Sequence, residues 1–204
     1  MTEPEFKPWP KISRYNRDIV ITEKIDGTNG AIHIAPGDPS ESQDGWVAGV
    51  YVGNVFYKVG VQSRNRIVNL GDNHFGFAQW ANDNAQALVE TLGEGTHFGE
   101  WWGRKIARAY DQTDRTFSLF NTSRWRMADT RLVPGLSVVP VLYEGPMSQN
   151  AINDAQHDLR LKGSSAAPGF MRPEGIVIYH TAANVMFKIT LENDEVPKGN
   201  NARN

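Results

Sequence analysis

The most informative stretch of the chain is Thr22-Glu23-Lys24-Ile25-Asp26-Gly27-Thr28-Asn29-Gly30. It follows a β-rich run, residues 18–21, and places a lysine at the end of a predicted strand, beside a glycine that permits a sharp turn. A lysine held on a stiff element can act as a nucleophile once its amine has lost its proton. A solvated lysine before a turn would have the same local sequence, so Lys24 alone leaves both interpretations open.

The segment Lys24-Ile25-Asp26-Gly27 resembles the Lys-x-Asp-Gly motif of covalent nucleotidyltransferases, which include ATP-dependent DNA and RNA ligases and mRNA capping enzymes. Residues 23–29 are most similar to the RNA ligase 2 branch, where Glu-Lys-x-x-Gly-Thr-Asn recurs. The resemblance covers about residues 20 to 190. Its further motifs follow in the family's order: Ser63-Arg64-Asn65, Phe98-Gly99-Glu100-Trp101, Phe117-Ser118-Leu119-Phe120-Asn121, Glu174-Gly175-Ile176-Val177-Ile178 and Phe187-Lys188.

The chain departs from the family pattern at two positions. The terminal motif usually reads Lys-x-Lys, but Met186 stands at the earlier position here. One phosphate contact is therefore missing or comes from elsewhere, and Lys162 and Arg172 are candidates. Asp26 replaces a histidine that is often found in the RNA ligase 2 branch, and it matches the wider superfamily.

The resemblance implies attack of the Lys24 amine on the α-phosphorus of ATP, which yields a lysine–AMP phosphoramidate and pyrophosphate. It also implies that Lys188 contacts the α-phosphate and that Glu174 binds Mg²⁺ (or Mn²⁺), which prefers hard oxygen ligands. These three residues are the predicted catalytic group. The predicted ATP-binding residues are Glu23, Lys24, Asp26, Gly27, Asn29, Arg64, Glu100, Phe120, Glu174, Val177 and Lys188.

By the same resemblance, Glu100 falls at the ribose hydroxyls, Phe120 stacks on adenine, and Arg64 contacts the nucleotide or an RNA phosphate. Val177 could close the other face of the base. Ordinary alternatives exist, because a phenylalanine in an apolar strand is core in most proteins and Glu174 could simply be exposed. Glu100 is harder to dismiss, since a carboxylate beside tryptophans needs a partner or water.

Hydrophobic patterning predicts an α+β fold built on antiparallel sheets flanked by helices. The resemblance implies a nucleotidyltransferase domain over residues 1–190, with ATP held between two sheets, and a polar tail over 191–204. About fifteen residues follow Lys188, so we expect no appended oligonucleotide-binding barrel. Strands are predicted at 18–26, 30–34, 46–52, 56–63, 96–103, 115–120, 137–143, 175–180 and 184–189, and helices at 76–92 and 148–161.

Composition sets outer limits on the class of protein. A hydrophobic content of 40% over 204 residues suits one domain. The absence of cysteine excludes disulfides and thiolate metal sites and fits a cytoplasmic protein. No stretch has the length of a membrane span, and the first residues lack a signal-peptide pattern. We expect a monomer that does not interact with membranes. Residues 1–17 are rich in proline and polar residues and are expected to lie over the surface.

The formal net charge of −2 argues against binding of nucleic acid by bulk charge alone. Cations cluster between Arg104 and Arg131, however, and Trp101, Trp102, Tyr110 and Trp125 lie in or beside that segment. Cations can contact phosphates while aromatic rings stack on bases, although a solvated surface has the same pattern. The residues predicted to bind nucleic acid are Arg104, Arg108 and Arg126.

These observations predict an ATP-dependent polynucleotide ligase that joins 5′-phosphate and 3′-hydroxyl ends through a lysine–AMP intermediate. An RNA ligase is the favoured interpretation. Its partners would be RNA, or alternatively DNA, strand ends. One alternative is a DNA ligase or another AMP-transferring enzyme. A second alternative is a nucleotide- or nucleic-acid-binding module that has kept the fold without catalysis. The presence of Lys24, Glu100, Glu174 and Lys188 argues against that module.

Overall fold

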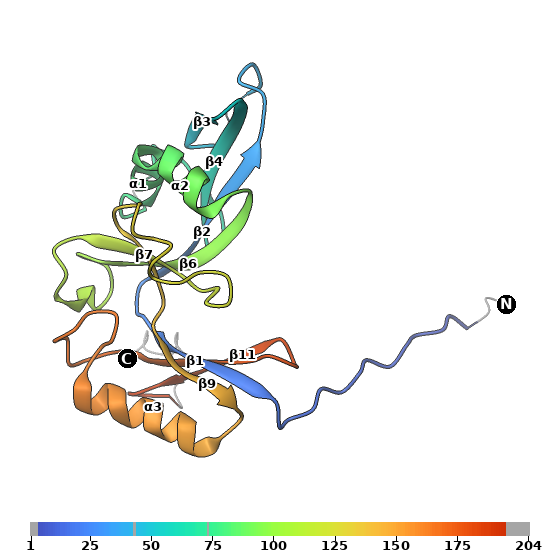
Figure 1. Ribbon diagram of the computed structural model, residues 1–204, viewed down its shortest axis with the longest axis vertical. Coiled ribbons are helices and arrows are strands. Elements are labelled where there is room, and N and C mark those ends of the chain that lie inside the picture. The colour runs from blue at the N-terminus through green and yellow to red at the C-terminus, as the bar shows by residue number, and fades with distance from the viewer. Residues whose placement is uncertain (1–3, 43, 73, 195–204) are drawn as a thin grey trace, which may run out of the picture.

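The computed structural model describes residues 4–42, 44–72 and 74–194, and within them the chain forms two β-sheets with helices on their outer sides (Figure 1). The α+β fold with antiparallel sheets is therefore confirmed. Residues 195–204 of the predicted polar tail lie outside the described residues. Within the described ranges, no helix combines the length and the apolar character needed to cross a membrane.

The smaller sheet has the strand order β11-β10-β1-β9, and all its pairs are antiparallel. Ile19 and Ile21 of β1 alternate with less buried residues and pack against α3, together with Ile176 and Ile178 of β10. Ser148 caps α3, because its Oγ accepts a hydrogen bond from the Ala151 amide at 3.3 Å. The elements are β1 (Asp18–Lys24), β9 (Val141–Pro146), α3 (Gln149–Lys162), β10 (Gly175–His180) and β11 (Val185–Thr190).

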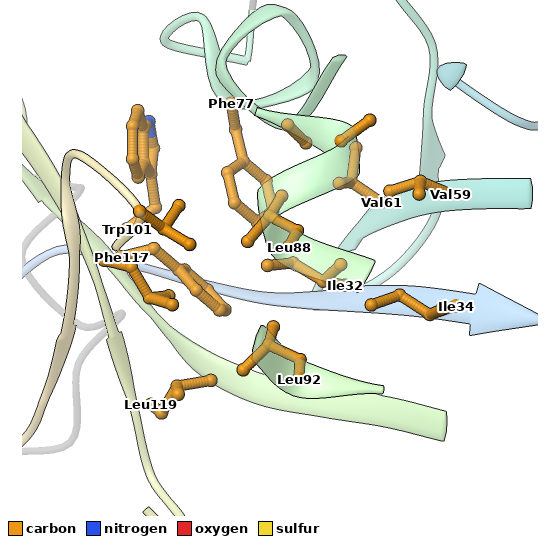
Figure 2. Close-up of a cluster of buried hydrophobic side chains, with 14 of the residues drawn as sticks. Ile32, Ile34, Val59, Val61, Phe77, Leu88, Leu92, Trp101, Phe117 and Leu119 are labelled. Carbon is orange, nitrogen blue, oxygen red and sulfur yellow. The ribbon is translucent and has the colours of Figure 1, made fainter. Parts of the chain in front are cut away.

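The larger sheet has the order β3-β4-β2-β6-β7-β8, and β5 pairs with β4. Phe77 of α1 packs between Trp101 and Phe117, with ring centroids 5.3 and 5.0 Å away (Figure 2). The elements are β2 (Thr28–Pro36), β3 (Ala48–Val52), β4 (Val55–Ser63), β5 (Ile67–Val68), α1 (Phe77–Asp83), α2 (Ala85–Leu92), β6 (Gly95–Gly103), a 3₁₀ turn (Ala109–Asp111), β7 (Arg115–Leu119) and β8 (Leu136–Val138).

Two predicted elements are divided in the structure. The helix predicted over 76–92 breaks at Asn84, whose side-chain Nδ2 donates to the Trp80 carbonyl at 2.8 Å and competes with the backbone ladder. The strand predicted over 137–143 becomes β8 and β9, which belong to different sheets. Pro140 lies between them, has no N–H to donate, and accepts from the Glu23 amide through its carbonyl.

Two other features of the larger sheet were not predicted. β7 and β8 pair in parallel, within a fold that the sequence predicted to be built on antiparallel sheets. The two-residue strand β5 was absent from the prediction, because so short a strand has no detectable alternation. The remaining predicted strands are present with boundaries that differ by a few residues.

The two sheets meet where β1 ends and β2 begins. Ile25 is buried there in a separate apolar cluster, which it shares with Trp102, Tyr110 and Phe170 among others. This cluster fixes residues 25–27, and with them the end of β1, against the larger sheet. The segment with the predicted nucleophile is therefore held at the junction of the two sheets.

Candidate active site

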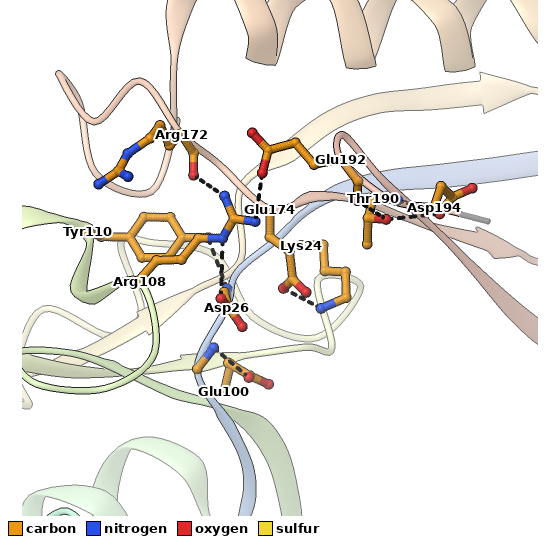
Figure 3. Close-up of polar contacts among 11 residues, drawn as sticks. Lys24, Asp26, Glu100, Arg108, Tyr110, Arg172, Glu174, Thr190, Glu192 and Asp194 are labelled. Atoms are coloured by element: carbon orange, nitrogen blue, oxygen red, sulfur yellow. Dashed lines mark hydrogen bonds and ion pairs between the residues drawn. The ribbon is translucent and has the colours of Figure 1, made fainter. Parts of the chain in front are cut away.

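Lys24 is the last residue of β1 and lies opposite Gly175 of β10. Because side chains alternate along a strand, Lys24 and Thr22 point away from the face that packs on α3. The Lys24 amine donates a hydrogen bond to Glu174 Oε2 and forms an ion pair with it (Figure 3). Glu174 has only 2% of its side chain exposed. The structure thus joins two of the three predicted catalytic residues into one partly buried pair.

Gly27 makes the turn from β1 into β2 beside Glu100. Its amide donates to Glu100 Oε1 at 3.0 Å. A Cβ at Gly27 would lie 2.5 Å from the Trp101 carbonyl oxygen and 2.8 Å from Trp102 Cβ, so no side chain fits. The glycine of the motif is required here by the close approach of this turn to β6, and Asn29 lies directly opposite Glu100 in the ladder.

Burial raises the pKa of Glu100 from 4.5 to about 7. The charge of Lys24 and the hydrogen bond from Gly27 lower the pKa, but they offset this effect only in part. Glu100 therefore takes up a proton near neutral pH. A carboxyl with a shifted pKa beside an amine is the kind of group that marks functional sites.

We expect the raised pKa of Glu100 to make stability depend on pH. A group whose pKa is higher in the folded state contributes stability below its unfolded pKa, and this is lost as pH rises through the folded value. Glu100→Gln imitates the protonated form. The variant should match the wild type near pH 4.5 and exceed its free energy of unfolding by up to about 3 kcal/mol at pH 8.

Urea unfolding of both proteins at pH 5, 6, 7 and 8 measures this difference. Glu94→Gln, at an exposed position six residues earlier, is the control and should show a constant difference across the series. A constant difference for Glu100→Gln as well would contradict the raised pKa.

Glu23 lies on the opposite face of β1 from Lys24, in line with Ile19 and Ile21. Its buried carboxylate accepts from Ser164 Oγ at 2.6 Å and from the amides of Ser165 and Ala166 at 2.8 and 2.9 Å. Burial raises the pKa of Glu23, and these hydrogen bonds act against that rise. The loop that follows α3 therefore holds the Glu23 carboxylate, and the structure does not bring this carboxylate to the Lys24 amine.

Tyr110 is a site residue whose role sequence reasoning missed. Its hydroxyl accepts from the Asp26 amide at 2.9 Å, and its ring is fully buried with Phe170 at a centroid distance of 4.6 Å. Tyr110 has φ of 52°, and Lys105, Ala107 and other residues of this loop also have positive φ. No sequence pattern signals this strained turn, since none of these residues is a glycine.

Arg108 lies on the same loop and connects several segments of the site (Figure 3). Its Nε lies 3.3 Å from Asp26 Oδ2, its Nη1 donates to the Arg172 carbonyl at 2.9 Å, and its Nη2 lies 3.5 Å from Glu192. The guanidinium thus links the end of β1 to the segments that flank β10 and β11. To contact a nucleic acid, as the sequence predicted, Arg108 would have to release these partners.

The predicted base and phosphate contacts lie on strands around this pair. Val177 of β10 is half-buried and lies opposite both Thr22 and the exposed Lys188 of β11. Phe120 follows β7, is 37% exposed, and donates its amide to the Phe98 carbonyl at 3.0 Å. Phe98 lies two residues before Glu100 on β6. The exposed side chains of Phe98 and Phe120 therefore lie beside the Glu100 carboxyl.

Arg64 lies in the exposed turn after β4, directly beyond Ser63, which pairs with Gly30. That register puts Arg64 at the end of the larger sheet that carries Asn29 and Glu100. The structure therefore gathers the sequence-predicted nucleotide residues around one junction, with Glu23 turned to the other face.

Of the two candidates for the missing phosphate contact, Arg172 lies two residues before Glu174 and its carbonyl accepts from Arg108, whereas Lys162 lies away from the site. Lys162 forms an ion pair with Asp158 at 2.8 Å on α3, on the other face of the smaller sheet from Lys24. Arg172 lies over the Phe170 ring at 5.7 Å. A cavity of about 490 Å³ also lies along α3 and β9, and this face is remote from Lys24. Met186 is 69% exposed opposite Tyr179.

The tryptophans and the tyrosine in and beside the basic segment, residues 104–131, are buried. Trp101, Trp102, Tyr110 and Trp125 are all at most 9% exposed and belong to the apolar clusters, so burial rules out the interpretation in which they stack on bases. Their regular interleaving with cations reflects strands and loops with one buried face. The side chains of Arg104 and Arg126 are exposed.

Comparison with known proteins gave a family and a set of solved structures. The RNA ligase family model matches residues 17–190. No curated protein matches the chain. A variant of the Naegleria gruberi RNA ligase with ATP and Mn superposes with a TM-score of 0.55 at 14% identity, covering 87% of this chain and 51% of that one.

Two further variants of the Naegleria gruberi RNA ligase, each with AMP and Mn, give similar values. The TM-scores are 0.53 and 0.52 at 15% identity, and the matches cover 86% and 85% of this chain and 50% and 49% of those chains. This likeness shows a shared fold. The chain spans about half the length of the solved structures it matches.

Proposed function

The chain belongs to the RNA ligase family, and from that premise we propose that it is an ATP-dependent RNA ligase that forms a lysine–AMP intermediate at Lys24. The observation that carries the proposal is the pairing of the Lys24 amine with the buried Glu174, beside Glu100, at the junction of the two sheets. Positioning of a nucleophile on a rigid element is a large part of phosphoryl-transfer catalysis.

The first step forms one bond and breaks one. The Lys24 nitrogen attacks the α-phosphorus of ATP, the N–P bond forms, and the bond to pyrophosphate breaks. The amine must give up its proton, and Glu174 already accepts a hydrogen bond from it. In the later steps AMP passes to the 5′-phosphate of a strand and is displaced by a 3′-hydroxyl.

A divalent cation fits this site through Glu174. The described residues contain no cluster of three or more His, Cys, Asp or Glu side chains that could hold a metal. Mg²⁺ usually keeps several waters and takes one or two carboxylates plus substrate phosphates, so one buried carboxylate suits this mode. We propose Glu174 as that ligand, and the metal, Mg²⁺ or Mn²⁺, would offset the charge that develops on the phosphates.

The nucleotide contacts are proposed from the placement described above. Glu100 would accept from the ribose hydroxyls, Phe120 would stack on adenine, and Val177 would contact its other face. Lys188 and Arg64 are the exposed cations proposed to contact phosphates, and Asp26 and Asn29 would line the turn beside the nucleotide. A monomeric state and a cytoplasmic location stay predictions.

The direct test of the proposed function is incubation of the protein with ATP labelled at the α-phosphate, in Mg²⁺. Label that stays on the protein after denaturation is the expected result, and its absence would favour a module that binds without catalysis. Release of that label onto a 5′-phosphorylated strand, with RNA and DNA strands compared, separates an RNA ligase from a DNA ligase.

We expect the exposed cations of the basic segment to contribute to strand binding. Arg104→Ser combined with Arg126→Ser should lower sealing of a pre-adenylylated RNA severalfold at subsaturating RNA, with the larger loss at the lower salt concentration. Each lost phosphate contact reduces the steepness of the plot of log binding constant against log salt concentration by about 0.7. Sealing at 50 and 200 mM salt measures the effect.

The matched control for this pair is Arg160→Ser, because Arg160 is an exposed arginine of α3 on the far face of the smaller sheet. Its sealing should equal that of the wild type. If the double variant seals normally at both salt concentrations, these two arginines are not part of the RNA surface.

A further inference from the structure

Residues 4–17 form an extended arm that leaves the smaller sheet and projects away from the rest of the molecule (Figure 1). The arm carries large apolar side chains at every third position. Phe6, Trp9, Ile12 and Tyr15 are 86%, 85%, 86% and 68% exposed. Phe6 and Trp9 are the most exposed aromatic side chains in the described part of the chain. The arm thus projects from the molecule (Figure 1), whereas the sequence predicted that this segment lies over the surface.

The arm is anchored at its base and free beyond it. His180 Nε2 donates to the Tyr15 carbonyl at 2.8 Å, the Met147 amide donates to the Arg17 carbonyl at 3.0 Å, and Ser13 Oγ donates to the Ala182 carbonyl at 3.2 Å. These contacts fix residues 13–17 against the end of the smaller sheet. Residues 4–12 extend from that base.

The composition of the arm favours an extended conformation that presents one apolar face. Prolines at positions 4, 8 and 10 favour the polyproline II helix, which has three residues per turn. Side chains spaced by three residues then lie on the same side. The arm also holds Lys7, Lys11, Arg14 and Arg17 against a single acidic residue, Glu5, although the whole chain is slightly acidic.

We propose that this arm binds single-stranded RNA, with Phe6, Trp9 and Tyr15 stacking on bases and the interleaved cations contacting phosphates. The choice of RNA rests on the proposed function. Aromatic rings and cations in alternation are the means by which proteins hold single strands without reading sequence. The arm supplies exposed rings, which the buried aromatics of the basic segment do not.

The position of the arm sets the length of strand that it can serve. β1 runs from the base of the arm to Lys24, and its seven residues span roughly 20 Å. A stacked strand advances about 3.4 Å per nucleotide, so about six nucleotides separate the reacting end from the arm. The arm should therefore matter for long strands and not for very short ones.

Fluorescence anisotropy with a labelled 20-nucleotide oligouridylate, without ATP, tests the proposal. Trp9→Ala is expected to weaken binding about tenfold, which is typical of the loss of one stacked base. Changing Lys7, Lys11 and Arg14 together to Ser should lower the salt slope by about two. A control that combines Tyr51→Ala with Leu132→Ala removes exposed apolar side chains from other surfaces and should bind normally.

Ile12→Ser separates RNA from an apolar partner. Ile12 is as exposed as Phe6 and Trp9, but it has no ring to stack on a base. The proposal expects less than a twofold change in RNA binding for this variant. Equal losses for Ile12→Ser and Trp9→Ala, or no loss for either Trp9→Ala or the lysine–arginine variant, would overturn it.

Strand length gives a second readout. Trp9→Ala should reduce sealing of 20-nucleotide strands much more than sealing of strands of about five nucleotides, and equal reductions would also overturn the proposal. The anisotropy experiment needs no ATP. Failure of the wild-type chain to form lysine–AMP would therefore count against the role of Lys24 and leave the result for the arm intact.

Discussion

Lys24→Arg is expected to abolish transfer of AMP from ATP to the protein while the fold is retained. Arginine keeps a positive charge beside the buried Glu174, so the ion pair that fixes the end of β1 can persist. Its guanidinium stays protonated at any accessible pH and cannot attack phosphorus. Label from α-labelled ATP on the denatured protein should fall to background, and thermal unfolding should stay within a few degrees of the wild type.

Lys24→Ala should also lose all labelling, but it should unfold at a lower temperature. Removal of the amine takes away the cation that faces the buried Glu174 carboxylate, and a buried charge without its counter-charge is costly. The matched control is Lys58→Arg, since Lys58 also forms an ion pair with a glutamate, Glu41, at 2.9 Å on the larger sheet. That variant should label normally. Labelling that persists in folded Lys24→Arg would show that another residue is the nucleophile.

Glu174→Gln should reduce lysine–AMP formation by about a hundredfold or more while ATP binding changes only a few-fold. A metal held by this carboxylate acts on charge that develops during reaction more than on the bound ground state. The loss corresponds to about 3 kcal/mol, since each 1.36 kcal/mol of barrier is tenfold in rate. Single-turnover labelling gives the rate, and equilibrium binding of ATP to Lys24→Arg combined with Glu174→Gln gives the affinity without reaction.

Glu41→Gln is the control for this prediction, because it breaks the comparable ion pair with Lys58 outside the site. It should leave the labelling rate unchanged. Equal losses of rate and of ATP affinity in Glu174→Gln would assign this carboxylate a structural role. A loss of folding, seen by circular dichroism, would have the same meaning.

The sequence predicted the strands and the local motifs well, because both depend on neighbouring residues. Runs of β-branched and apolar residues predicted β1, β10 and β11, and the order of motifs pointed to Lys24, Glu100 and Glu174, which the structure places close together. The alternation of side chains along β1 also predicts the position of Glu23, because Glu23 lies on the same face of the strand as Ile19 and Ile21. That signal was present, and the resemblance to the family outweighed it.

The rest of the site depends on contacts between segments that are distant in sequence. Tyr110 meets the Asp26 amide across 84 residues through a strained turn that no propensity describes. From the sequence alone Arg108 could not be told from a surface cation, whereas in the structure it forms ion pairs with Asp26 and Glu192. The break at Asn84 and the change of sheet at Pro140 arise from single residues within longer favourable patterns.

The division of the chain between the two sheets has a consequence for synthesis. All strands of the larger sheet lie within residues 28–138, whereas β1 pairs with strands that begin at residues 141 and 175. A ribosome adds about 5–20 residues per second, so Glu174 is made roughly 8–30 s after Lys24, from which it is separated by 150 positions. The larger sheet can form on the nascent chain while β1 still lacks both neighbours. Lys24 thus enters the tunnel well before its partner, and the order of synthesis itself delays assembly of the site until Glu174 has been made and β10 can pair with β1.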